Sequence, residues 1–132
     1  RLDFMLYCGK DIVAYIEVKG VTLVEDGIGL FPDAPTVRGR RHVDELAQLA
    51  REGARAAVLF VVQREDGRKV APNWRTDPAF AEALARACAE GVEARAYGCR
   101  ISPEEAVLQR ELPVDLSYPP GGLGTKGWTR LE

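Results

Sequence analysis

IVAYIEVKGVTLV, residues 12–24, is rich in β-branched side chains and has the length of a long strand. Residues 1–7 alternate enough to form a second strand before it. The Gly-Lys-Asp sequence at residues 9–11, between the two stretches, has the composition of a turn. We therefore predict that the two strands form an antiparallel hairpin.

A carboxylate and an ammonium interrupt the apolar pattern of the longer strand. Because the side chains of a strand alternate, Glu17 and Lys19 share one side with Tyr15 and Val21. Charged groups on such a buried-looking side need partners or a ligand. Antiparallel pairing with the first strand brings Asp3 next to Glu17. We expect two acids and one lysine to lie close together.

Such a set of residues suits a metal-dependent reaction. Two neighbouring carboxylates repel each other unless a cation lies between them, and Mg²⁺ (or Mn²⁺) prefers oxygen ligands. We predict Asp3 and Glu17 as metal ligands and, together with Lys19, as catalytic residues. Lys19 acts electrostatically, by orienting the attacking water or by stabilising a charged phosphorus centre. The alternative is a simple surface ion pair between Glu17 and Lys19, because short patterns match by chance.

The rest of the chain alternates between helical and extended patterns. Thr36 and Asp77 are suitable helix caps, Pro78 suits a first helical position, and Gly53 and Gly91 suit helix ends. The predicted segments are a loop at 25–35, a helix at 36–51, a strand at 56–62, a loop at 63–76, a helix at 77–91 and strands at 92–101 and 107–116.

These elements indicate an α/β domain over residues 1–116, with a mixed sheet flanked by helices in the order ββαβαββ. Residues 117–132 have two prolines, four glycines and no periodic pattern, which predicts an irregular tail.

Composition limits the possible partners. The net charge of −2 excludes a dedicated DNA-coating protein, so any contact with DNA must be local. No apolar run approaches the roughly 18 residues of a membrane span, and the first residues lack the features of a signal peptide. We predict a cytoplasmic protein without membrane contact. The three cysteines form no CxxC pair, which favours reduced, structural thiols.

A local basic patch opens the first predicted helix. Arg38, Arg41 and His42 lie in its first turns, where the helix dipole disfavours cations and favours a bound anion. We predict that these residues bind nucleic acid, with free amides of the helix start contributing phosphate contacts. The alternative is a solvated face balanced by Asp44 and Glu45.

Three stretches resemble the sugar fermentation stimulation protein family: RLDFML at 1–6, YIEVKGVTLVEDGIGLFPDAPTVRGRRH at 15–42 and LFVVQR at 59–64. The resemblance runs from Arg1 to about Leu116. It implies a restriction-endonuclease-like domain of the PD-(D/E)xK superfamily, whose members are typically Mg²⁺-dependent phosphodiesterases acting on DNA. Asp3, Glu17 and Lys19 match the acid-acid-lysine pattern. The resemblance begins beyond the N-terminal OB-like domain usual in this family, so we expect residues 1–132 to lack that domain.

Three functions follow as hypotheses. The first is a DNA-binding, metal-dependent nuclease that hydrolyses phosphodiester bonds. The second is a non-catalytic DNA-binding regulator of sugar utilisation genes, in which the nuclease fold is only a scaffold. The third is a protein-interaction module that forms a homo-oligomer, with a second copy covering exposed surface.

Overall fold

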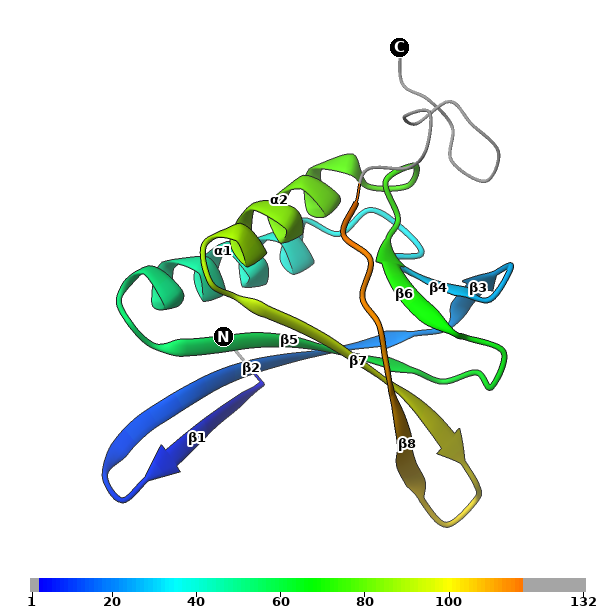
Figure 1. The fold of residues 1–132 in the computed structure, drawn as a ribbon, viewed down its shortest axis with the longest axis horizontal. Coiled ribbons are helices and arrows are strands. Elements are labelled where there is room, and N and C mark those ends of the chain that lie inside the picture. The colour runs from blue at the N-terminus through cyan, green and yellow to red at the C-terminus, as the bar shows by residue number, and fades with distance from the viewer. Residues whose placement is uncertain (1–2, 118–132) are drawn as a thin grey trace.

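A five-stranded mixed sheet is the main element of the computed structural model, which describes residues 3–117 (Figure 1). β1 and β2 are antiparallel, β2, β5 and β7 are parallel, and β7 and β8 are antiparallel. The predicted hairpin is therefore confirmed. The strands lie side by side in the order β1 (Phe4–Cys8), β2 (Asp11–Val21), β5 (Arg55–Val62), β7 (Glu93–Ile101) and β8 (Ala106–Leu112).

The hairpin of β1 and β2 contains an irregularity in its register. Phe4 pairs with Ile16 and Leu6 with Ala14, but the next residue, Tyr7, pairs with Ile12. Val13 of β2 is thus an extra residue without a partner on β1. This is the arrangement of a β-bulge, which bends a strand and increases its twist.

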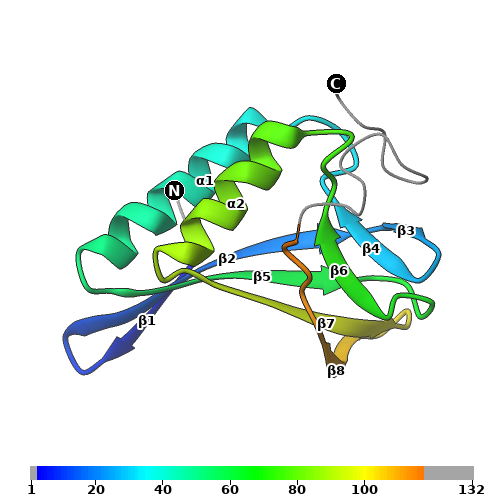
Figure 2. The same ribbon diagram turned by 45° about the horizontal axis from the view of Figure 1, so that its top comes forward.

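Two helices, α1 (Val37–Arg51) and α2 (Pro78–Ala89), lie together on one face of the sheet (Figures 1 and 2). Both begin as the sequence predicts, because Thr36 Oγ1 accepts a hydrogen bond from Gly39 N and Asp77 Oδ1 accepts one from Phe80 N. The prediction of flanking helices is correct only for this face. Within residues 3–117, no helix covers the other face of the sheet.

The core lies between the helices and the sheet. β5 places every second side chain there, and these side chains are buried. Phe31 fills the end of the core, with its ring centroid 5.6 Å from that of Phe60 and 5.2 Å from that of Phe80. The largest fully buried apolar side chains of the five-stranded sheet and the helices are Phe60, Phe80, Leu46, Leu84, Val21, Val43, Val58 and Val62.

Three short strands form a second sheet that the sequence did not predict. β3 (Leu23–Glu25), β4 (Ile28–Phe31) and β6 (Lys69–Pro72) pair in that order. The predicted strand at 12–24 is divided at Thr22 into β2 and β3. The predicted loops at 25–35 and 63–76 contain β4 and β6.

Gly29 gives the physical reason for this error. A Cβ atom there would lie 3.1 Å from Val21 Cγ1, so Gly29 allows β4 to pack closely against β2. The turn between β3 and β4 lies instead at Asp26 and Gly27, which both have positive φ angles. The observed order within residues 3–117 is ββββαββαββ instead of ββαβαββ.

The predicted irregular tail lies outside the described residues, apart from Ser117. None of the helices within residues 3–117 combines the length and the hydropathy that crossing a bilayer requires.

Candidate functional site

Glu17 lies on β2 and points toward the helices, into the interior. Its register partner on β5 is Val58, whose side chain is fully buried, and Glu17 itself is only 2% exposed. A carboxylate at such depth is stable only with close partners. Glu17 Oε2 lies 3.1 Å from Lys19 Nζ and 2.9 Å from His42 Nδ1, so two side chains supply that partnership.

His42 comes from α1 and closes a triangle of polar atoms. Its Nδ1 lies 3.1 Å from Lys19 Nζ, in addition to its contact with Glu17. Burial, followed by the positive charge of Lys19, holds the pKa of His42 below its ordinary value, although Glu17 acts in the opposite direction. The lowered pKa favours the neutral form of the ring.

Asp3 lies across the hairpin from Glu17. Its backbone N donates a 3.2 Å hydrogen bond to Glu17 Oε1, and its own Oδ2 accepts a 2.9 Å bond from Val18 N. The structure thus places Asp3 beside Glu17 and Lys19, with the backbone of Asp3 in contact with the Glu17 carboxylate. Asp3 is exposed, whereas Glu17 is buried, so solvent reaches the site from the side of Asp3.

The donor set is suitable for a hard divalent cation only in part. Asp3 and Glu17 offer carboxylate oxygens, and Mg²⁺ commonly uses one or two carboxylates with waters and phosphate oxygens completing its shell. No cluster of three or more His, Cys, Asp or Glu side chains with metal-binding geometry occurs within residues 3–117. With only these two carboxylates, a bound metal would take most of its ligands from solvent and substrate.

The start of α1 is fixed by a shared carboxylate. Thr36 N donates to Asp77 Oδ2 at 2.8 Å, while Asp77 Oδ1 accepts from Phe80 N of α2. Gly39 allows the cap at Thr36, because a Cβ at residue 39 would lie 2.7 Å from Thr36 Cγ2. These contacts tie the start of α1, which lies before His42, to the start of α2.

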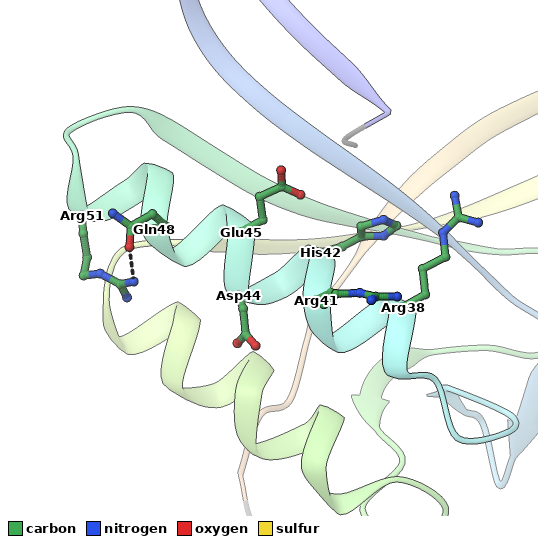
Figure 3. A pocket seen from close by; sticks show the side chains of 7 residues that line it. All are labelled: Arg38, Arg41, His42, Asp44, Glu45, Gln48 and Arg51. Atoms are coloured by element: carbon green, nitrogen blue, oxygen red, sulfur yellow. Dashed lines mark hydrogen bonds between the residues drawn. The ribbon is translucent and has the colours of Figure 1, made fainter.

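Arg38 and Arg41 lie exposed on α1 beside His42 (Figure 3). A depression of about 840 Å³ runs along this side of the helix. Arg51, at its far end, pairs with Glu90 of α2. Among the contacts within residues 3–117, no ion pair involves Arg38 or Arg41. The depression is lined by Arg38, Arg41, His42, Asp44, Glu45, Gln48 and Arg51.

The contact of His42 with Glu17 was not predicted from the sequence, where His42 is grouped with Arg38 and Arg41. A signal was available, because His42 lies four residues before the buried Leu46 and so shares its side of the helix. The structure buries His42 to 6% exposure. Its contact with nucleic acid stays a prediction.

Comparisons with known proteins agree on one family. The model of the "Sugar fermentation stimulation protein RE domain" matches residues 1–105. A sugar fermentation stimulation protein homolog of Moorella thermoacetica is 52% identical over 116 residues, which are 88% of this chain and 50% of that protein. The homolog of Acetivibrio thermocellus is 51% identical over 117 residues, 86% of this chain and 49% of that protein.

A solved structure shows the same fold. The chain is similar to Pyrococcus furiosus SfsA, solved in complex with Ca²⁺, with a TM-score of 0.80 and 38% identity over 87% of this chain and 50% of that one. This chain spans about half the length of the relatives that it matches. On these matches, the chain belongs to the sugar fermentation stimulation protein family.

Proposed function

We propose that this chain is a DNA-binding, nuclease-like domain that hydrolyses phosphodiester bonds with a divalent cation. The observation that carries the proposal is the buried Glu17, which contacts Lys19 and lies across the β1–β2 hairpin from the exposed Asp3. This is the acid-acid-lysine set of the PD-(D/E)xK superfamily. The parallel strands β2, β5 and β7 with helices on one face also support a restriction-endonuclease-like arrangement.

Asp3 and Glu17 are the residues that hold the cation in this proposal. The similar Pyrococcus furiosus protein was solved with Ca²⁺, which supports a site for a hard divalent cation in this chain as well. We propose Mg²⁺, or Mn²⁺, as the ion of the reaction, because Ca²⁺ and Mg²⁺ share a preference for oxygen ligands. When bound, the cation lowers the pKa of water and offsets the charge of a phosphodiester.

Lys19 and Glu17 have separate roles. Glu17 Oε2 lies 3.1 Å from Lys19 Nζ and places a negative charge beside that ammonium, whose side chain is only 13% exposed. The charged Lys19 stabilises negative charge on the phosphate oxygens as the phosphorus–oxygen bond breaks. Asp3, at the solvent side, lies where a DNA strand reaches the site first.

Arg38 and Arg41 form the proposed DNA contact. Both project from the first turns of α1, next to the end of the helix that carries partial positive charge. Two guanidinium groups there supply local positive charge on a protein whose net charge is −2. We leave His42 out of this contact, because its ring is buried against Glu17.

One observation favours a second candidate, a non-catalytic DNA-binding regulator. Glu17 Oε2 is already in contact with Lys19 and His42, and residues 3–117 contain no group of three or more metal-binding side chains. In such a protein the Glu17–Lys19 pair serves stability, and Arg38 and Arg41 serve DNA binding alone.

The test is cleavage of single- and double-stranded DNA with Mg²⁺ or Mn²⁺. Under the nuclease proposal, Glu17→Gln and Lys19→Ala each reduce the cleavage rate by about 100-fold or more, as expected for loss of a preorganised charge. Glu82→Gln on α2 and Lys10→Ala in the hairpin turn are matched controls at exposed positions and leave the rate unchanged.

Absence of cleavage by the wild-type chain, or equal rates in the site variants and controls, contradicts the nuclease proposal. DNA binding then separates the remaining candidates. Arg38→Ala and Arg41→Ala each weaken binding and lower the slope of log affinity against log salt by about one if these residues contact phosphates. Arg86→Ala, an equal charge loss on α2, is the control.

A further inference from the structure

The proposed reaction gives no role to His42, although His42 contacts two charged residues of the site, Glu17 and Lys19. The three relevant atoms are Glu17 Oε2, Lys19 Nζ and His42 Nδ1. Glu17 Oε2 lies 2.9 Å from His42 Nδ1 and 3.1 Å from Lys19 Nζ, and Lys19 Nζ lies 3.1 Å from His42 Nδ1. Each atom is therefore within hydrogen-bonding distance of the other two. His42 reaches this position from α1, whereas the other two residues belong to β2.

The hydrogen-bond donors and acceptors of Glu17, Lys19 and His42 show what His42 adds. The Lys19 ammonium has donors and no acceptor, whereas Nδ1 of a neutral ring carries either a proton or a lone pair. With a lone pair, Nδ1 is a second acceptor for Lys19. With a proton, Nδ1 donates to Glu17 Oε2 and fixes the oxygen that Lys19 contacts. In both cases His42 adds a second hydrogen bond to the Glu17–Lys19 contact.

That second bond matters because the lysine side chain is long. A lysine side chain has about 2 kcal/mol of rotamer entropy, and one contact at its tip leaves part of that freedom. Lys19 is held between a carboxylate on its own strand and a ring on the packed helix. The ring is itself only 6% exposed, and it belongs to a helix whose first turn is capped by Thr36 and tied to Asp77.

We propose that His42 is a positioning residue, whose Nδ1 keeps the Lys19 ammonium and the Glu17 carboxylate in fixed positions relative to each other. Its consequence for cleavage rests on the proposed nuclease function. The ordering of the Lys19 side chain does not depend on that function, because it is a property of the protein without metal and can be measured without DNA.

Three variants separate hydrogen bonding at Nδ1 from packing. His42→Asn places an amide atom close to the position of Nδ1, and this amide can donate or accept. His42→Gln places its amide one bond farther out, and His42→Leu fills the space without a polar atom. The readout is the ¹⁵N resonance of the Lys19 ammonium at low temperature, identified by its loss in Lys19→Arg.

We expect a slowly exchanging Lys19 ammonium signal in the wild type and in His42→Asn, and its loss in His42→Gln and His42→Leu. Thermal unfolding establishes that each variant is folded. If His42→Leu does not fold, the comparison of His42→Asn with His42→Gln still decides, because both side chains are polar. In a wild type that cleaves DNA, His42→Gln lowers the rate by about 10–100-fold, the usual loss when a supporting group is removed, and His42→Asn restores it.

Persistence of the Lys19 signal in folded His42→Gln and His42→Leu overturns the proposal, and so does its loss in His42→Asn. A wild type that shows the expected signals but cleaves no DNA contradicts only the nuclease function. The two failures are therefore distinguishable.

Discussion

The two faces of the five-stranded sheet both carry ion pairs, but in opposite environments. On the helix-covered face, the side chains of Glu17 and Lys19 are 3% and 13% exposed. On the open face, Arg55 pairs with Glu93 at 2.7 Å, and these side chains are 66% and 34% exposed. The N···O distances of 3.1 Å and 2.7 Å do not explain the difference between the two ion pairs. The lesson is that burial, and not contact length, makes Glu17 dependent on its partners and therefore a candidate for function.

The largest expected effect is on stability and tests the buried side of this comparison. Lys19→Met leaves Glu17 in the interior without its charged partner, and we expect it to reduce the free energy of unfolding by about 3 kcal/mol. Urea denaturation followed by circular dichroism measures this change. Lys10→Met, at an exposed turn position, is the control. Equal stability of the two variants would show that burial does not distinguish Lys19.

The thiols allow the same comparison between interior and surface. Burial raises the pKa of Cys88 on α2 to about 11, whereas Cys8 at the end of β1 is exposed. Because the thiolate is the reactive form, we expect iodoacetamide at pH 8 to modify Cys8 at least ~10-fold faster than Cys88. Mass spectrometry of digested samples measures both rates. Similar rates in the folded protein, and not only in urea, would contradict the prediction.

A smaller effect is expected in the pH dependence of stability. The pKa of His42 lies below its ordinary value of 6.5 because of burial and the charge of Lys19. The unfolded chain therefore binds a proton at a higher pH than the folded protein does. The free energy of unfolding falls as the pH decreases through 6.5, and this fall ends below the lowered pKa.

His42→Asn removes this contribution and should flatten the profile near pH 6.5. Urea titrations at several pH values provide the measurement. A profile that is identical in the wild type and in His42→Asn would show that His42 titrates with the same pKa in both states.

The smallest effect is expected on the open face. Arg55 lowers the pKa of Glu93, which favours folding above the ordinary pKa of 4.5 and loses this contribution as the pH falls through the lowered value. Because solvent screens this pair, Arg55→Gln should leave the urea midpoint at pH 7 nearly unchanged. If Arg55→Gln lost as much free energy of unfolding as Lys19→Met, the two faces would not differ in how much their ion pairs contribute to stability.

Local patterns predicted much of the fold and of the site. The β-branched run of β2, the caps at Thr36 and Asp77 and the alternation that places Glu17 and Lys19 on one side are properties of neighbouring residues. β4 was missed because Gly29 resembles a loop residue, and only its packing against Val21 explains the glycine. The contact of His42 with Glu17 joins residues on two elements, and no local pattern contains that distance.

The extra residue in β2 determines on which side of the hairpin Asp3 lies. In each pair from Phe4 to Leu6, the residue numbers of the two partners add to an even total. In the pairs between the bulge and the turn, they add to an odd total. Continued to Asp3, the even total sets it opposite Glu17, whereas the odd total would set it opposite Ile16 and on the reverse side. A regular hairpin of the same length, in which Val13 paired with Leu6, would thus separate the two acids without altering either of them.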